Sequence, residues 1–404
     1  MKKVLFYCSI IAAFLVLGRS LFFGEEIPES PIKEPGYHEQ WMEMKTMGTG
    51  EIPENIQQKW YKASQRSSFR RTTGAVVDIN EIGPYNVAGR IRALLVDYTD
   101  ENHILAAGIS GGVWASYDKG ATWNPLNDHE VTLNVSCIDQ SKSNPAIIYY
   151  GTGEGSGNSV GFDGSGIFKS TDTGKTFSQL DFTSDNINFN RSWKIKVDPR
   201  DEDIVYVSTD NRGLWRTDDG GVSFSQVLST SREMNDLEVL SDGKVFVTQK
   251  GGGIFMSPTG LDGTFTRLTG SGLLTSNFAR IEIAYCQTKQ NIMYAAFSSP
   301  DDGYNGFIVR VAKSTDTGKT WTAVTTPSNS QLNAGFTWYC KTMEVHPTNS
   351  DTIFIGAVTT AFSVNGGQSW ARAADPHADY HITYNNPHNP NELYVGHDGG
   401  ISLY

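Results

Sequence analysis

Apolar and polar positions alternate in short runs along most of the chain, and these runs recur in a fixed order. Each unit contains an alternating strand, a turn rich in Pro, Asn and Asp, a second apolar strand, a glycine-rich loop and a third strand. Alternation with a period of two is typical of half-buried β-strands. The turn between the first two strands is clearest at 96–105, 197–206, 345–354 and 384–394. The pattern therefore predicts an all-β protein built from repeated sheets.

The spacing of the units predicts six complete repeats and a seventh that stops in its third strand at Tyr404. One four-stranded sheet per repeat is the organisation of a β-propeller blade. An open ring would expose strand edges. We therefore expect either that residues 75–82 (AVVDINEI) supply the missing strand or that the chain is a fragment of a longer protein. The units begin near Arg90, Thr132, Arg191, Met234, Arg280, Tyr339 and Asp379.

The third strand of most units runs into an octapeptide of the form Ser/Thr-x-Asp-x-Gly-x-Thr/Ser-Trp/Phe. A short Asp side chain can accept backbone N–H bonds within a turn, and glycine tolerates positive φ. The aromatic residue that ends the motif begins another strand and can be buried between neighbouring sheets. A degenerate copy lies at 257–265. The third position is occupied by Asp118, Asp172, Asp219, Asp316 and Asn365.

This octapeptide resembles the Asp-box, or BNR, repeat of the sialidase-like β-propellers. That superfamily includes sialidases, xyloglucan-degrading hydrolases, sortilin-type receptors and photosystem assembly factors. The resemblance implies an all-β, seven-bladed β-propeller with Asp-box turns. Because enzymes and non-enzymes share the motif, it implies the architecture and leaves the activity open.

The first twenty residues combine Lys2 and Lys3 with an apolar run from Val4 to Leu17. This pattern is typical of a signal peptide, and the run is short for a bilayer span. We expect residues 1–20 to direct export, so that the mature chain is secreted or associated with the cell surface and has no membrane span. Residues 21–74 are expected to form a linker with a short helical segment, and residues 75–404 the propeller. The net charge of −11 argues against nucleic acid as a partner.

Three cysteines would remain after export, and each lies in a strand-like stretch where a small thiol behaves as a core residue. Their odd number and scattered positions argue against a disulfide framework, although a single bridge is left open. These cysteines are Cys137, Cys286 and Cys340.

A ligand site is expected at the rim opposite the octapeptide turns, where the first strands start and the loops between second and third strands lie. Long loops on a rigid scaffold are where function concentrates. Arginines at this rim would suit a carboxylate or another anion, and aromatic side chains would form platforms for a ligand. The expected ligand-binding residues are Arg90, Arg191, Trp193, Tyr304 and Tyr339, with Trp338 as a further aromatic candidate.

An enzymatic alternative follows from two resemblances. Sialidases clamp a substrate carboxylate with three arginines, but this chain lacks their Phe-Arg-Ile-Pro signature and has no evident Tyr/Glu nucleophile pair. Residues 89–126 resemble the xyloglucan-degrading propellers more closely, yet Ser110 stands where that family has a catalytic Asp before Gly-Gly. Glycoside hydrolysis ordinarily requires two carboxylates at a defined separation. A hydrolase would therefore use Asp398 with Asp210 or Glu154.

A metal site is a further possibility at the same rim. His377, Asp379 and His381 alternate with a period of two, which would place their side chains on one face of an extended strand. Such a group could bind a divalent metal, although ion-pair networks are the commoner cause of these clusters. No other cofactor is expected.

The sequence as a whole favours a binding or scaffold module that engages an extracellular glycan or protein. A glycoside hydrolase acting on polysaccharide is the alternative. Whether the chain is an enzyme stays open, with the missing partner carboxylates favouring a binding role.

Overall fold

The computed structural model describes residues 89–126, 130, 132–155, 162–300, 306–333, 335–373 and 377–404. The predicted signal peptide (1–20), the linker (21–74) and the segment 75–82 lie outside the described residues. Helix is confined there to two 3-10 turns, η1 (Asp181–Thr183) and η2 (Ile187–Phe189), and one α-helical turn, α4 (Asn329–Leu332). No helix in the described ranges has the length and apolar character needed to cross a membrane.

The strands form seven antiparallel sheets, as the repeat spacing predicted. Blade one contains β1 (Ile91–Val96), β2 (Ile104–Gly108), β3 (Gly112–Ser116) and β4 (Asn124–Pro125), and blade two contains β5 (Val135–Gln140), β6 (Ile148–Thr152), β7 (Ile167–Ser170) and β8 (Ser178–Gln179). Blade three contains β9 (Ser192–Val197), β10 (Val205–Thr209), β11 (Leu214–Thr217) and β12 (Ser225–Leu228), and blade four contains β13 (Met234–Val239), β14 (Val245–Gln249), β15 (Gly253–Ser257) and β16 (Thr266–Arg267). Blade five contains β17 (Ile281–Cys286), β18 (Lys289–Ser298), β19 (Ile308–Ser314) and β20 (Thr322–Val324). Blade six contains β21 (Thr342–Val345), β22 (Ile353–Gly356), β23 (Thr360–Ser363) and β24 (Ala371–Arg372), and blade seven contains only β25 (Tyr380–Asn385), β26 (Leu393–His397) and β27 (Gly400–Leu403).

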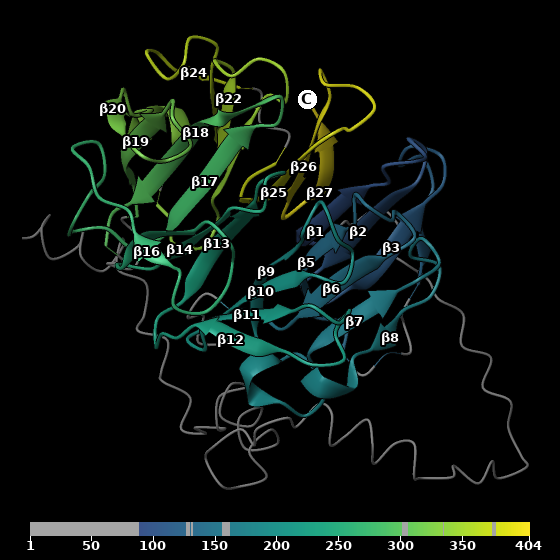
Figure 1. The fold of residues 1–404 in the computed structure, drawn as a ribbon. Coiled ribbons are helices and arrows are strands. Elements are labelled where there is room, and N and C mark those ends of the chain that lie inside the picture. The colour runs from purple at the N-terminus through teal and green to yellow at the C-terminus, as the bar shows by residue number, and fades with distance from the viewer. Residues whose placement is uncertain are drawn as a thin grey trace, which may run out of the picture. The chain divides into compact units, whose positions relative to one another are not determined.

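The seven sheets close into a ring, which makes the described part a seven-bladed β-propeller. The first strand of each blade packs beside the first strand of the next, and β1 completes the circle against β25. Figure 1 shows β1, β5, β9 and β25 converging on a common centre. The first strands therefore surround an axial channel, and the fourth strands lie on the outside.

The strand registers place the two kinds of loop at opposite ends of each blade. In blade one, Ile91 at the start of β1 pairs with Gly108 at the end of β2. Ser116, where the octapeptide begins, pairs with Ile104 at the other end of β2. The rim predicted from the sequence therefore corresponds to one end of the channel, which we call the mouth.

The octapeptide turns are built by hydrogen bonds around their third residue. In blade three, the Thr217 hydroxyl donates to Asp219 Oδ1 at 2.7 Å, and Ser223 donates to the same carboxylate through its amide (3.0 Å) and its hydroxyl (2.7 Å). These Ser223 bonds lower the pKa of Asp219 to about 2. Asn365 makes the matching bonds in blade six with Ser363 and Ser369. The same pattern surrounds Asp118, Asp172 and Asp316.

The core lies between neighbouring sheets, where the aromatic residue of each octapeptide is placed. Trp321 of blade five is 2% exposed and packs with Phe246 and Leu268 of blade four. Burial of aromatic rings removes a large apolar area from water, so these residues join one blade to the next. The three cysteines are also buried as free thiols. Burial raises the pKa of Cys137 to about 12, which keeps this thiol protonated.

Candidate functional site

In five of the seven blades, the first strand contains a β-bulge near the mouth. The pairing of β1 with β2 shifts by one residue at Arg92, and the pairing of β25 with β26 shifts at His381. Equivalent shifts occur at Ser136, Trp193 and Asn235. A β-bulge of this kind leaves one residue unpaired and re-aims its side chain. Arg92, Trp193 and His381 thereby line the channel.

Arg90 and Asp398 form the central ion pair of the mouth. The Arg90 guanidinium donates from Nε to Asp398 Oδ1 at 2.6 Å and from Nη2 to Oδ2 at 2.9 Å. Paired bonds of this kind are among the strongest polar contacts in proteins. Burial opposes ionisation of Asp398, but bonds from His381 and Arg90 hold its pKa well below the usual range. Asp398 is therefore an ionised acceptor and cannot act as a general acid near neutral pH.

His381 links this ion pair to a second arginine, and its partners fix its tautomer. Its Nδ1 lies 3.2 Å from Arg92 Nη1, and its Nε2 lies 2.7 Å from Asp398 Oδ1. A guanidinium can only donate, so Nδ1 accepts and Nε2 carries the proton that is donated to Asp398. Burial lowers the pKa of His381 to about 3. The imidazole is therefore neutral over the physiological range.

The structure brings together a tyrosine and a glutamate that the sequence gave no reason to pair. The Tyr339 hydroxyl donates to Glu154 Oε1 at 2.5 Å and accepts a hydrogen bond from Arg90 Nη1. A tyrosine beside a glutamate is the nucleophile arrangement of sialidases. Here burial raises the pKa of Tyr339 above its usual range, so the phenol stays protonated. The pair therefore acts in this structure as a link between blades two and six.

Arg92 is a buried cation without a carboxylate partner. It is 8% exposed, and within the described part of the chain it forms no ion pair with Asp or Glu. Its guanidinium lies 5.0 Å from the Tyr339 ring centre and 5.9 Å from that of Trp193. The indole N–H of Trp193 is also buried and finds no hydrogen-bond partner among the described residues. Burial lowers the pKa of Arg92, as expected for a cation removed from water.

Two buried cations lie beneath the mouth: Arg280 holds the Tyr339 backbone, and Lys341 holds the Arg280 backbone. Arg280 donates to the Tyr339 carbonyl at 2.5 Å and to the Lys341 carbonyl at 2.7 Å, while it also pairs with Glu282. Lys341 is fully buried and donates to the Arg280 carbonyl at 2.7 Å and to the Ser298 hydroxyl at 2.9 Å. Burial lowers the pKa of Lys341 well below its usual value. Both cations are therefore positioning residues.

Arg191 forms a separate cluster at the mouth. Its Nε lies 2.7 Å from Asp163 Oδ1, and its Nη1 lies 3.6 Å from Asp210 Oδ2. Asp210 also accepts from the Asn211 side chain at 3.0 Å. Burial and the nearby Glu233 raise the pKa of Asp210. The environment of Asp210 thus favours protonation, in contrast to that of Asp398.

The predicted aromatic platforms lie in different settings. Trp193 is 4% exposed and Tyr339 is 8% exposed, so both rings are largely inside the protein. Trp338 is half-buried, with its ring centre 5.5 Å from that of Tyr339. Tyr304 lies outside the described residues. Trp193 and Tyr339 therefore expose little surface to a ligand, and their binding roles stay predictions.

The predicted metal ligands do not share one strand face. β25 begins at Tyr380, so His377 and Asp379 precede it, and Asp379 has a left-handed backbone with φ of 63°. His377 stacks on His397, whereas His381 is turned toward Arg92 and Asp398 by the bulge. Among the described residues, no group of three or more His, Cys, Asp or Glu side chains could hold a metal ion. The assumption of a regular extended strand across 377–381 was wrong.

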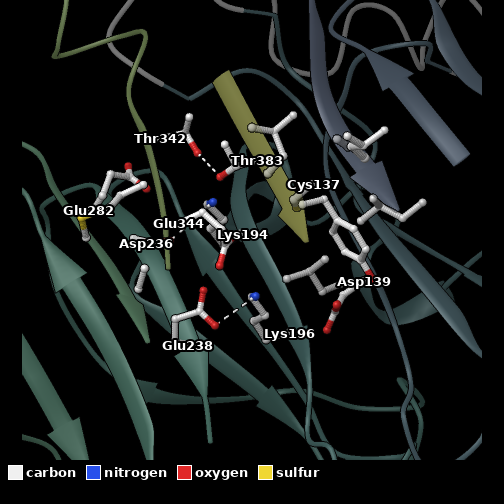
Figure 2. Close-up of a pocket in the computed structure, with 18 of the residues that line it drawn as sticks. Cys137, Asp139, Lys194, Lys196, Asp236, Glu238, Glu282, Thr342, Glu344 and Thr383 are labelled. Carbon is white, nitrogen blue, oxygen red and sulfur yellow. Dashed lines mark hydrogen bonds and ion pairs between the residues drawn. The ribbon is translucent and has the colours of Figure 1, made fainter. Parts of the chain in front are cut away.

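Below the mouth the channel narrows to a charged zone that we call the waist, shown in Figure 2. Lys196 Nζ lies 3.1 Å from Glu238, and Lys194 Nζ lies 3.5 Å from Asp236. Burial and the neighbouring Glu238 raise the pKa of Glu344 to about 8. The channel encloses a cavity of about 140 Å³. The waist consists of Asp139, Lys142, Lys194, Lys196, Asp236, Glu238 and Glu344.

Arg92, the Tyr339–Glu154 pair and the waist were not found by sequence reasoning. The inner strands show charged residues at alternate positions, as in Asp236 and Glu238, and that signal could have located the waist. The contacts of Arg90 with Asp398 and Tyr339 span 308 and 249 residues, so no local pattern indicates them.

Comparisons with known proteins agree with this architecture. No family model matches the chain. A xyloglucanase from Hypocrea jecorina is 26% identical over 200 residues, which cover 42% of this chain and 24% of that protein. The solved GH74 xyloglucanase from Xanthomonas campestris is similar in fold, with a TM-score of 0.61 and 16% identity over 79% of this chain and 52% of that one.

A third protein of similar fold is the solved structure of YCF48 bound to D1 peptide. It has a TM-score of 0.54 and 14% identity, over 78% of this chain and 93% of that one. The propeller is thus similar in fold to those of xyloglucanases, while the chain spans about half the length of the GH74 structure and a quarter of the curated xyloglucanase. In length it is closer to the YCF48 chain.

Proposed function

We propose that this chain is an exported Asp-box propeller that binds an extracellular glycan or protein at the channel mouth. The part of the ligand that enters the mouth carries a carboxylate or another anionic group. Arg92 and the indole N–H of Trp193 are the donors that receive it, and Arg90 and Arg191 flank the entrance.

The observation that carries this proposal is the unbalanced charge of Arg92. Burying a cation without an anion is costly, and the cost falls when a negative group arrives. The neighbouring guanidinium groups already have carboxylate partners, Asp398 for Arg90 and Glu282 for Arg280. Arg92 is therefore the group at the mouth whose hydrogen-bonding capacity is largely unused.

Two further points support a binding role. Asp398 and Glu154 are held by Arg90 and Tyr339, so neither is placed to transfer a proton. The YCF48 propeller, which this chain covers almost completely, was solved with a peptide bound. Export is supported by the signal-like residues 1–20.

The alternative is a glycoside hydrolase, and one observation favours it beyond the relation to xyloglucanases. The raised pKa of Asp210 is the property that a general acid requires. Such an enzyme would need a second carboxylate across an open cleft. Asp398 is bonded to Arg90 and Glu154 to Tyr339, so we rank the hydrolase below the binding function.

The deciding experiment measures binding and catalysis on the same preparation. The purified chain is applied to arrays of neutral glycans, uronate-containing glycans and acidic peptides, and is also incubated with a polysaccharide panel to detect released reducing ends. We expect selective retention of anionic ligands and no reducing-end release. Release that is abolished by Asp210→Asn would establish the hydrolase, and retention of neutral glycans alone would contradict the anionic requirement.

A further inference from the structure

The seam between blade seven and blade one differs from the other six seams. Blade seven has three strands, and β27 has no partner on its outer edge within the described residues. Leu393 and Tyr404 exchange backbone hydrogen bonds, and Ser402 is the next residue of β27 directed toward β26. The backbone groups of Ile401 and Leu403 therefore face the open edge.

A large cavity lies along this edge. It has a volume of about 640 Å³ and is lined by Trp114, Trp123, Ile401 and Leu403. Trp114 is 36% exposed and Leu403 is 54% exposed, which is unusual for large apolar side chains in this fold. An exposed apolar groove beside an unpaired strand edge is a site for another strand.

The other seams show what belongs in this position. At the seams before blades three and six, an aliphatic side chain from the outer strand of one blade packs against an octapeptide glycine of the next, and at the seams before blades two and five the nearest side chains are Leu105 and Phe246 of second strands. A methyl group added at Gly221 would meet Leu180 at 2.5 Å, and one added at Gly367 would meet Val324 at 2.7 Å. At Gly120 of blade one, the only side chain within reach is its own neighbour Trp123. The aliphatic residue that would cover Gly120 is missing from the described part.

The backbone partner of the missing residue can also be identified. Leu126, Leu180 and Leu268 each donate their N–H to the third strand of their own blade, at 2.8–2.9 Å. The acceptors are the carbonyls of Val113, Ile167 and Ile254. By position in the blade, the corresponding acceptor in blade seven is the carbonyl of Ile401, which faces the open edge.

We propose that residues 75–82 of this chain form the fourth strand of blade seven, antiparallel to β27. Ile79 donates its N–H to the Ile401 carbonyl, which pairs Val77 with Leu403. The side chains of Val77 and Ile79 fill the cavity over Gly120, while Asp78 and Asn80 point to solvent. This alternation suits a strand with one buried face.

The length of the intervening chain supports this occupant. Gly89, the first described residue, lines the same cavity. Between Ile79 and β1 there are eleven residues, 80–90. In the other blades the corresponding connections range from five residues (229–233, between Leu228 and β13) to seventeen (325–341, between Val324 and β21). The segment therefore reaches the edge with a connection of ordinary length and the required direction.

Disulfide trapping in the full 404-residue chain tests the strand and its register. Cys8 is replaced by Ser in every variant to remove the one native thiol outside the described residues. We expect Val77→Cys with Leu403→Cys to form an intramolecular disulfide at least about tenfold faster than the matched control Ile52→Cys with Leu403→Cys. Asp78→Cys with Leu403→Cys should be slower than the Val77 pair, because Asp78 lies on the opposite face. Non-reducing electrophoresis and peptide mass spectrometry identify the products.

Equal rates for the Val77, Asp78 and Ile52 pairs would overturn the proposal. Disulfide-linked dimers would also overturn it, because they would mean that a second copy donates the strand. Amide hydrogen exchange gives an independent measure without new cysteines. The amides of Ile401 and Leu403 should be protected in the native chain and lose about tenfold or more of this protection when Val77→Asp and Ile79→Asp are combined. The control Ile52→Asp should leave the protection of both amides unchanged. Unprotected Ile401 and Leu403 amides in the native chain would contradict the proposed fourth strand.

Discussion

The same first strands contribute to the mouth and to the waist, yet the pKa values of Asp398 and His381 at the mouth are lowered and that of Glu344 at the waist is raised. At the mouth, Arg90 and His381 both donate to Asp398, so the carboxylate is ionised and the imidazole neutral. At the waist, four carboxylates face three ammonium groups, and the pKa of Glu344 rises to about 8. Equivalent positions on repeated strands thus share burial, whereas the neighbouring blades decide which protonation state is stable.

This difference also separates the two regions functionally. At the mouth, Arg92 forms no ion pair with Asp or Glu within the described residues, and its side-chain hydrogen-bond partner there is the neutral His381. Carboxylates at the waist exceed the available cations. An anionic ligand therefore gains a cationic partner at Arg92, whereas the carboxylates of the waist already face Lys142, Lys194 and Lys196.

The largest expected effect comes from removing the unpaired cation of the mouth. We expect Arg92→Met to weaken binding of an anionic ligand about 100-fold, which corresponds to about 2.7 kcal/mol. The same substitution should raise the free energy of unfolding by about 1 kcal/mol or more, because it replaces a buried unpaired charge with an apolar side chain. Titration calorimetry with the best array ligand and urea denaturation measure the two quantities.

Arg267→Met, on the outer strand β16, is the matched control and should change neither quantity appreciably. If Arg92→Met lost stability together with binding, Arg92 would be a structural residue. The mouth could then not be distinguished from the waist as the region that binds the ligand.

The second prediction concerns the ion pair that defines the mouth. Arg90→Ala removes the two-bond partner of Asp398 and a donor to Tyr339, so we expect a loss of about 2 kcal/mol in unfolding free energy. Arg191→Ala should cost less than about 1 kcal/mol, because Arg191 makes one close contact with an acceptor that is 30% exposed. Chemical denaturation of both variants checks the order. Equal losses would mean that the two arginines are equivalent, as their positions in the sequence repeat imply.

The third prediction is a pH dependence of opposite sign at the two regions. The folded pKa of His381 is about 3, below its ordinary 6.5, so the unfolded state binds more protons between these values. Stability from His381 is therefore present above pH 6.5 and is lost as the pH falls toward 3. Glu344 has a folded pKa of about 8, above its ordinary 4.5, so its contribution is lost as the pH rises from 4.5 to 8.

Two substitutions separate these contributions. His381→Asn should flatten the acidic side of the stability profile, and Glu344→Gln should raise stability by about 1 kcal/mol at pH 9 while changing little at pH 5. Melting temperatures measured from pH 4 to 9 provide the profiles. A Glu344→Gln profile parallel to that of the parent would mean that the waist does not hold Glu344 in its protonated form.

The smallest effect is expected far from both regions, at an octapeptide turn. Asp219→Asn should cost less than about 0.5 kcal/mol, because Asn365 in blade six also accepts the serine amide and replaces the second bond by donating from Nδ2 to the Ser369 hydroxyl. Asp219→Ala should cost about 1 kcal/mol, as for other side chains that bind turn or cap amides. Thermal unfolding of the two variants distinguishes them. A larger loss for Asn than for Ala would show that the charge, and not the hydrogen bonding, stabilises this turn.

The seven-bladed fold could be predicted from the sequence because its signals are local. Strand alternation, the turn after β1 and the hydrogen bonds of Asp219 all involve residues within a few positions of one another. The spacing of the repeats also predicted where each blade begins, including the positions of Arg90 and Arg191. The position of the rim could be predicted for this reason, and the partners of its side chains could not.

The sequence by itself determined the number of blades, the octapeptide turns and the end of the channel where a site is expected. Only the tertiary structure decided that Tyr339 meets Glu154, that Arg90 meets Asp398, and that Arg92 meets a neutral His381. These contacts join blades that are distant in the chain, and a one-residue bulge turns Arg92 and His381 toward the axis. Local patterns fix the strands, but ring closure fixes which charges meet, and that cannot be deduced from any one repeat.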